Sequence, residues 1–180
     1  MTDSSFALFD KYQKAMSNAG MGLWEWNFQT DTITFDVALS KLYEVYDESA
    51  PIKLSGQSGE WYLIIHDEDR EMMRSLIESA KNDESELNTK FRILLKDGSV
   101  KYIRTHAYNI RDENNKVTGL VGLNWDVTRE SLLQNDVAKN KIFLEKIMDA
   151  IPDPVFVKDC GHNLIFGNQA FENLMGLKRK

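Results

Sequence analysis

Between residues 87 and 127, apolar and polar side chains alternate, and no other feature of the sequence constrains the fold as strongly. The alternation is interrupted by Asp97-Gly98, a pair favoured in tight hairpin turns, and by the polar segment DENNK that begins at Asp112. A period of two is typical of half-buried strands. The segment is therefore predicted to form a three-stranded antiparallel meander, with strands over about 87–95, 100–111 and 117–127.

Two shorter strands and several helices are predicted before the meander. Alternation over 22–28 places Trp24, Trp26 and Phe28 on one face, and a turn leads to a second strand over 33–35. From 36 to about 81 the apolar spacing is helical, except in SAPIKLSGQSGE, which is predicted to be a loop. These elements predict an α+β fold in which a five-stranded antiparallel sheet has helices packed on one face.

A helix is predicted on each side of this fold. In residues 1–20, an amphipathic flanking helix has apolar side chains at helical spacing, namely Phe6, Phe9, Tyr12 and Met16. In residues 129–150, a linker helix has a heptad seam with one polar member, and the seam consists of Leu133, Val137, Asn140, Leu144, Ile147 and Ile151. A short two-chain coiled coil fits this seam. A single amphipathic helix lying on its own domain remains the alternative.

Composition excludes several classes of partner. The chain has 180 residues, of which 42% are hydrophobic and 28% charged, an ordinary globular balance. Its net charge of −6 disfavours nonspecific binding to nucleic acid or anionic lipid. Its longest apolar runs fall far short of the roughly 18 residues of a membrane span, and its N-terminus does not resemble a signal peptide. We therefore expect a cytoplasmic segment that contacts neither membrane nor nucleic acid.

Four short motifs occur in order along the chain. They are GLWEW at 22–26, Trp61 followed by HDEDR at 66–70, the Asp97-Gly98 hairpin, and DVT at 126–128. Together they resemble a PAS domain over residues 21–128, of the subgroup with a Gly-x-Trp-x-Trp opening, a His-Pro-Glu-Asp-Arg motif and a closing Asp-Ile-Thr. Asp67 replaces the proline of that motif, and Tyr102 stands where the subgroup often has tryptophan. Asp67 is expected to cap the helix that starts there.

The last 30 residues resemble the opening of a second PAS domain of the more general type. Residues 151–180 include the strand VFVKD and a helix start at Asn168 and Phe171. So short a piece is not expected to bury a core alone, so the chain looks cut within this domain. The resemblance implies a tandem sensor region before a single output domain. We expect this output domain to be a histidine kinase, with a diguanylate cyclase as the second choice. Because no catalytic motif is found, these 180 residues are not expected to be an enzyme.

The resemblance also places the residue two before the Asp of the closing motif, here Asn124, in the pocket of the domain. Alternation along the strands then gives the candidate lining, which is Trp26, Phe91, Ile93, Ile103, Thr105, Leu120 and Asn124. Such an interior could hold a small, weakly polar ligand, and a filled core explains it equally well. The leading prediction is a sensory and dimerisation module; the alternative is a ligand-free protein-interaction domain.

No cofactor or metal is predicted. The acidic residues of HDEDR are expected to begin a helix rather than to hold an ion, since consecutive helical residues point about 100° apart. Cys160 lacks the Asn-Cys-Arg setting of flavin-binding relatives, so flavin is not expected. Heme is not expected either, because His106 lies in a strand and His162 in a turn.

The opposite face of the predicted sheet is apolar too, through Tyr102, Tyr108, Val121, Leu123 and Trp125. A monomer rarely exposes such a patch, so the N-terminal helix, a second subunit or both are expected to cover it in a homodimer. Signal transmission is expected at the exit of the last strand, where Asp126 and Thr128 can cap the linker helix and Asp126 can pair with Arg129. Asn140 is expected to weaken the coiled coil and bring two helix registers closer in energy.

Overall fold

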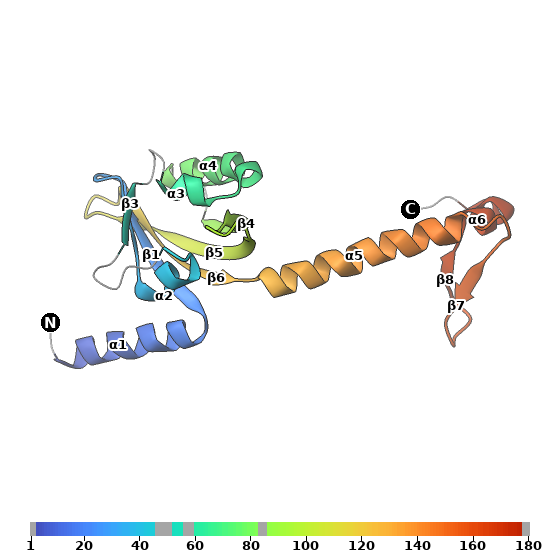
Figure 1. Cartoon of the computed structure of the whole chain (residues 1–180), viewed down its shortest axis with the longest axis horizontal. Helices are drawn as coiled ribbons and strands as arrows, with labels where there is room; N and C mark the ends of the chain where they lie inside the picture. The colour runs from blue at the N-terminus through green and yellow to red at the C-terminus, as the bar shows by residue number, and fades with distance from the viewer. Residues whose placement is uncertain (1–2, 46–51, 56–59, 83–85, 178–180) are drawn as a thin grey trace. The chain divides into compact units, whose positions relative to one another are not determined.

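The computed structural model describes residues 3–45, 52–55, 60–82 and 86–177. The chain divides into two compact units, Met1–Thr128 and Arg129–Lys180 (Figure 1). The boundary falls where the sequence predicts the change from sheet domain to linker helix.

The first unit is built on one antiparallel sheet. Its elements are α1 (Asp3–Asn18), β1 (Met21–Asn27), β2 (Thr32–Phe35), α2 (Val37–Leu42), β3 (Ile52–Ser55), α3 (Glu60–Ile64), α4 (Asp67–Lys81), β4 (Leu87–Leu94), β5 (Val100–Arg111) and β6 (Val117–Asp126). The strand order is β3-β2-β1-β6-β5-β4. Every neighbouring pair is antiparallel, which confirms the predicted α+β class.

The sheet has six strands rather than the predicted five. The additional strand, β3, lies inside the segment predicted to be a loop and pairs with β2, with Ile33 opposite Leu54 and Thr32 opposite Ser55. Four residues are too few for alternation to be recognised in the sequence. Its pairing occupies main-chain groups of β2 that would otherwise lie at the sheet edge, and β3 is the edge strand in its place.

Both predicted turns of the meander are confirmed. In the β4–β5 hairpin, Gly98 has φ 84°, and the carboxylate of Asp97 accepts a hydrogen bond from the main-chain N–H of Ser99 at 2.8 Å. In the β5–β6 hairpin, Oδ1 of Asp112 accepts from the main-chain N–H groups of Asn114 and Lys116 at 2.9 and 3.0 Å. These carboxylates hold their own turns together, as short acidic side chains commonly do.

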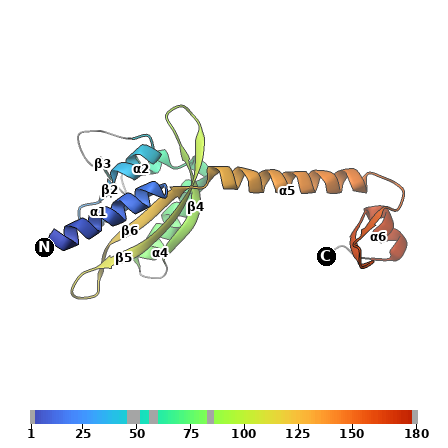
Figure 2. The same ribbon diagram turned by 90° about the horizontal axis from the view of Figure 1, so that it is seen from below.

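The core lies between the inner face of the sheet and helices α2, α3 and α4. Helix α2 packs so closely on β1 that a Cβ at Gly22 would lie 2.5 Å from the Cα of Leu39, so only glycine fits there. Helix α4 buries Met73, Ile77 and Ala80. Figures 1 and 2 together show α4 on one side of the sheet and α1 on the other.

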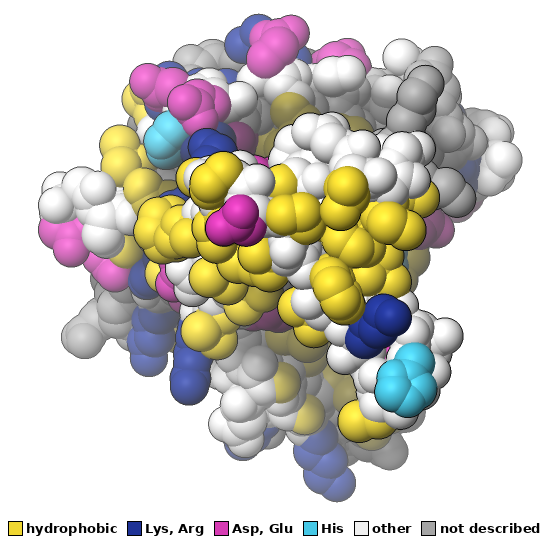
Figure 3. Space-filling view, turned by 90° about the vertical axis from the view of Figure 1, so that its right-hand side faces the viewer, with side chains coloured by type: hydrophobic (Ala, Val, Ile, Leu, Met, Phe, Trp, Pro, Cys, Tyr) yellow, Lys and Arg dark blue, Asp and Glu magenta, His cyan; other side chains and the backbone are white. Residues whose placement is uncertain are grey.

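The second unit comprises helix α5 (Thr128–Asp149), which starts at the last residue of the first unit, a hairpin of β7 (Phe156–Lys158) and β8 (Leu164–Gly167), and α6 (Gln169–Met175). Figure 3 looks at this end of the chain, where hydrophobic side chains gather on the surface. The exposed ones of β7, β8 and α6 include Phe156, Val157, Leu164, Ile165, Leu174 and Met175. These three elements therefore do not enclose a core of their own. Among the described residues, no helix has both the length and the apolar character needed to cross a bilayer.

Candidate functional site

The seven predicted lining residues all lie in the interior of the first unit. None of Trp26, Phe91, Ile93, Ile103, Thr105, Leu120 and Asn124 is more than 3% exposed. They come from four strands, β1, β4, β5 and β6, and face the helices across the core. The inward face inferred from the resemblance at Asn124, and extended by alternation along the strands, is thus the buried face of the sheet.

A chain of hydrogen bonds between buried side chains crosses this interior. The indole Nε1–H of Trp24 donates to Oδ1 of Asn124 at 2.8 Å, and Nδ2 of Asn124 donates to the hydroxyl of Tyr43 at 2.6 Å. An indole N–H can only donate, so the orientation of the amide is fixed by its two partners. The chain thus links β1, β6 and the C-terminal end of α2. Burial raises the pKa of Tyr43 well above its ordinary range, so its hydroxyl stays protonated.

The list of lining residues predicted from the sequence lacks Trp24 and Tyr43. Trp24 shares the face of Trp26, so alternation alone could have found it. Tyr43 follows the helical spacing after Leu39, but nothing in the sequence indicates that this helix end lies opposite Asn124.

The remaining space in the interior is very small. A cavity of about 10 Å³ is enclosed by Trp24, Trp26, Ile33, Trp61, Met73, Ile77, Leu87, Phe91, Thr105 and Asn124. That is about the volume one water molecule needs, and far less than an organic ligand occupies. The hydroxyl of Thr105 is buried beside it with no hydrogen-bond partner in the structure. The interior described here is a filled core.

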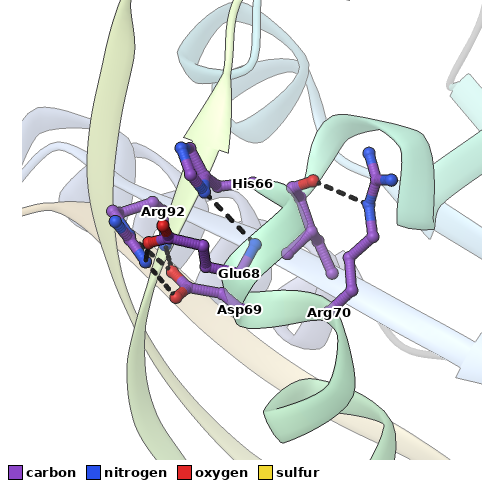
Figure 4. Close-up of polar contacts among 6 residues, drawn as sticks. His66, Glu68, Asp69, Arg70 and Arg92 are labelled. Atoms are coloured by element: carbon purple, nitrogen blue, oxygen red, sulfur yellow. Dashed lines mark hydrogen bonds and ion pairs between the residues drawn. The ribbon is translucent and has the colours of Figure 1, made fainter.

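The HDEDR motif fastens α4 to strand β4 (Figure 4). Oδ2 of Asp69 accepts from the main-chain N–H of Arg92 at 2.7 Å and from its Nε at 3.0 Å, and Oδ1 accepts from Nη2 at 2.6 Å. Glu68 adds a bond to Nη2 at 2.9 Å, and the main-chain N–H of His66 donates to the carbonyl of Arg92 at 2.9 Å. Hydrogen bonds from Arg92 lower the pKa of Asp69.

The predicted capping role of Asp67 is wrong. Helix α4 begins at Asp67, and its N-cap is His66, whose side chain accepts from the N–H of Glu68. Arg70 pairs with Asp67 at 2.7 Å, and its guanidinium also donates to carbonyls at the end of α3, those of Tyr62 and Leu63, and to that of Ile65. Within the described ranges, no group of three or more His, Cys, Asp or Glu side chains could hold a metal ion. The motif is a structural joint between two helices and a strand.

Asp69→Asn is expected to make the first unit less stable at pH 7 and less sensitive to acid. The folded-state pKa of Asp69 is lowered, so its carboxylate stabilises the fold above the unfolded value of about 3.9, and this stabilisation is lost as pH falls through the folded pKa. Urea unfolding at pH 7 should show a loss of about 2 kcal/mol, and the difference from the unmodified chain should shrink below about pH 3. Asp67→Asn is the matched control, since Asp67 is 81% exposed. A difference that stayed constant down to pH 2 would contradict this role of the carboxylate.

The last strand is joined to the first turn of α5 through the main chain of Tyr102 in β5. The N–H of Val127 donates to the carbonyl of Tyr102 at 2.8 Å, and the N–H of Tyr102 donates to Oγ1 of Thr128 at 2.9 Å. Oδ1 of Asp126 accepts from the N–H of Thr128, the first residue of α5, at 2.7 Å. The hydroxyl of Thr128 therefore bonds to the sheet rather than capping the helix as predicted. Arg129 is exposed.

The outer face of the sheet is only partly covered. Tyr102, Leu123 and Trp125 are half-buried, whereas Tyr108 is 53% exposed. On the flanking helix α1, Met16 is half-buried and Tyr12 is 61% exposed, while the side chains of Phe6 and Phe9 lie outside the described part of the chain. Although α1 is on this side of the sheet, the ring of Tyr108 in the sheet and that of Tyr12 in α1 remain in contact with solvent.

The candidate heme and flavin residues do not face the interior. His106 alternates with the inward Thr105 and lies on the outer face, 3.4 Å from the carboxylate of Glu86. His162 and Cys160 lie exposed in the turn between β7 and β8.

The predicted seam of α5 is exposed along the helix. Leu133, Val137, Leu144 and Ile147 are between 46% and 70% exposed, and Asn140 is exposed among them. The helix ends at Asp149, so the sixth predicted member, Ile151, lies beyond it.

Comparisons with known proteins agree with this architecture. A family model described as PAS fold matches residues 40–124, and a model described as PAS domain matches residues 142–180. The chain therefore belongs to the PAS family, with one match in its first unit and a second match in the unit that follows. PAS domains are sensor domains rather than catalytic ones.

A curated relative is the probable diguanylate cyclase DgcE of Escherichia coli (strain K12), which is 27% identical over 169 residues. The match covers 94% of this chain and 15% of the relative, so the chain spans a small part of that protein's length.

Two solved structures share the fold. One is a sensory box histidine kinase/response regulator from Burkholderia thailandensis E264, with a TM-score of 0.64 and 20% identity over 76% of this chain and 98% of that one. The other is the N-terminal domain of a diguanylate cyclase with PAS/PAC sensor from Marinobacter aquaeolei, with a TM-score of 0.52 and 22% identity over 62% of this chain and 98% of that one. These identities establish the PAS fold alone.

Proposed function

We propose that this chain is the sensory and dimerisation module of a cytoplasmic, bacterial signal-transduction protein. In this proposal, the state of the first PAS domain passes through the DVT segment and α5 to a downstream output domain. The observation that carries the proposal is the pair of hydrogen bonds at the main chain of Tyr102, whose carbonyl accepts from the N–H of Val127 and whose N–H donates to Oγ1 of Thr128. Because they join the sheet to the first residue of α5, a change in sheet packing moves the start of that helix.

The output domain we propose is a diguanylate cyclase. PAS domains precede both histidine kinases and diguanylate cyclases, and from the sequence alone we expected a histidine kinase. The relative matched over 94% of this chain is a probable diguanylate cyclase, which reverses that preference.

Homodimerisation is supported by two exposed apolar surfaces. One is the outer face of the sheet, where Tyr108 is 53% exposed, and the other is the seam of α5, where Val137 is 70% exposed. Surfaces of this kind mark association sites in most proteins. We propose a second copy of the chain as the partner, because the seam has the heptad spacing of a two-chain coiled coil. The outer face of the sheet would then be covered in the same dimer. Sedimentation that found a strict monomer at high concentration would contradict a dimer.

A ligand-free interaction domain is a second candidate function, and the size of the interior favours it. A cavity of about 10 Å³ leaves no room for an organic ligand without movement of the core. In this version the signal is the binding of a partner protein to the first PAS domain. Native mass spectrometry would distinguish the two, since a resident ligand adds mass to the folded chain and a filled core does not.

Thr128→Val is expected to change the basal output of the full-length protein. Valine has a similar shape but cannot accept the hydrogen bond from the N–H of Tyr102, which is now 2.9 Å from Oγ1. A lost bond of about 1 kcal/mol shifts a two-state equilibrium about fivefold. The measurement is the rate of cyclic di-GMP synthesis by the purified protein.

Thr118→Val is the matched control. Thr118 lies in β6, the strand that leads to Thr128, but its hydroxyl donates to the carbonyl of Ile110 at the hairpin end, away from α5. It should cost similar stability and leave the output unchanged. Equal outputs from Thr128→Val and the unmodified protein would refute transmission through the DVT segment.

A further inference from the structure

The side chain of Asn168 joins the end of α5 to the second PAS domain. Asn168 immediately precedes α6 and is 0% exposed. Its Nδ2 donates to three main-chain carbonyl oxygens, those of Met148 at 3.1 Å, Ile151 at 3.1 Å and Asp153 at 2.9 Å. Met148 belongs to the last turn of α5, whose carbonyls have no partner within the helix. The amide nitrogen therefore terminates α5 and holds the segment that follows it.

The oxygen of the same amide organises the start of the second domain. Oδ1 of Asn168 accepts from the main-chain N–H of Val155, just before β7, at 2.9 Å, and from that of Phe171, in the first turn of α6, at 3.0 Å. The N–H of Gln169 donates to the carboxylate of Asp149, the last residue of α5, at 2.9 Å. Figure 1 shows α6 beside this end of α5.

Hydrogen bonds are the directed contacts of this joint, where Met148, Ile151 and Phe171 are only half-buried. The seam residues of α5 are largely exposed, and the nearest of them, Ile147, is 46% exposed. The joint needs a side chain that both donates and accepts, as an amide does. The amide nitrogen bonds to carbonyls at and after the end of α5, and the amide oxygen bonds to N–H groups next to β7 and in α6. Aspartate keeps the acceptor and loses the donor, while alanine loses both, so the two functions of the amide are separable by substitution.

We propose that Asn168 is the positioning residue through which a movement of α5 reaches the second PAS domain. This inference rests on the proposed function, in which α5 conveys the state of the first domain. It adds that the amide of Asn168, and not the connecting chain alone, couples the helix to β7 and α6. A displacement of the carbonyls of Met148 and Ile151 moves the amide, and the amide moves the first turn of α6.

Hydrogen exchange on the 180-residue chain tests the joint itself. Just after α5, the N–H of Ala150 donates to the carbonyl of Lys146 and that of Ile151 donates to the carbonyl of Met148, both acceptors lying in the last turn of the helix. Asn168→Asp and Asn168→Ala should each make these two amides exchange about tenfold faster. The amide of Phe171 should stay protected in Asn168→Asp, which keeps the acceptor, and lose protection in Asn168→Ala. Asn173→Ala is the control, because Asn173 lies exposed on the same helix.

A double substitution tests transmission, a readout that a merely structural residue would not move. In the full-length protein, Thr128→Val should change the output about fivefold in the unmodified background and less than twofold in the Asn168→Asp background. In the Asn173→Ala background the fivefold change should persist.

The outcomes separate the two proposals. If Ala150 and Ile151 keep their exchange rates in Asn168→Asp, the amide of Asn168 does not stabilise the end of α5, and the proposed joint is refuted. If Thr128→Val keeps its full effect in the Asn168→Asp background, transmission through Asn168 is wrong and the proposed function stands. If Thr128→Val has no effect in the unmodified background, the proposed function fails, and this inference fails with it.

Discussion

Replacing Asn124 with leucine is expected to lower the free energy of unfolding of the first PAS domain by about 3 kcal/mol, although leucine has nearly the same shape. The substitution leaves the indole N–H of Trp24 and the hydroxyl of Tyr43 buried without the partners that now lie at 2.8 and 2.6 Å. Each unsatisfied group costs about 1–3 kcal/mol. Urea unfolding followed by tryptophan fluorescence measures the loss, since Trp24 itself is part of the chain of bonds.

Tyr43→Phe and the double variant separate the contributions of the two bonds. Tyr43→Phe removes one hydroxyl and should cost about 1 kcal/mol. In the double variant the losses should add up to less than the sum of the single ones, because both remove the same bond. If Asn124→Leu were as stable as the unmodified chain, the buried hydrogen bonds would contribute nothing to the fold, and Asn124 would be replaceable by any residue of its size.

Replacing Asn140 with leucine is expected to tighten the proposed homodimer about 100-fold. Asn140 is the polar member of the exposed seam of α5, so each subunit of a two-chain coiled coil would gain one apolar contact in place of a polar one. Two buried leucines contribute about 3 kcal/mol together. Sedimentation over a range of concentrations measures the dissociation constant, and in the full-length protein the same variant should hold the output in one state.

Asn135→Leu is the matched control for this variant. It makes the same substitution in the same helix, but position 135 is five residues away and faces outward from a seam built on spacings of three and four. Its dissociation constant should equal that of the unmodified chain. An equal change in the dissociation constant of both variants would mean that α5 associates through nonspecific hydrophobic contacts rather than through the seam.

The sequence allowed us to predict which side chains of each strand share a face, because successive side chains of a strand point to opposite faces of the sheet. The resemblance placed Asn124 inward, and alternation then put Phe91 and Thr105 on the same face, since a slip of one residue would expose every inward side chain. The turns were predictable for a local reason as well, since Asp97 and Asp112 bond to main-chain groups only two to four residues away.

Apart from the N-cap at His66, the missed contacts join segments distant in the sequence. Tyr43 meets Asn124 across 81 positions, and the hydroxyl of Thr128 bonds to a strand 26 positions earlier. The salt bridge between Asp69 and Arg92 could not be derived either, because the motif indicates only that a helix begins there. Local patterns give no information on such pairs; they depend on how the helices dock on the sheet.

The HDEDR joint also has a consequence for aggregation. Strand β4 lies at the end of the strand order, where free main-chain groups invite a neighbouring molecule to add a strand. At Arg92 both groups on that side are already occupied, the N–H by Asp69 and the carbonyl by the N–H of His66. Next to them Ile93 is bridged to Ile65. The motif thus blocks strand addition along this stretch of β4 and disfavours edge-to-edge growth of the sheet into fibrils at this edge.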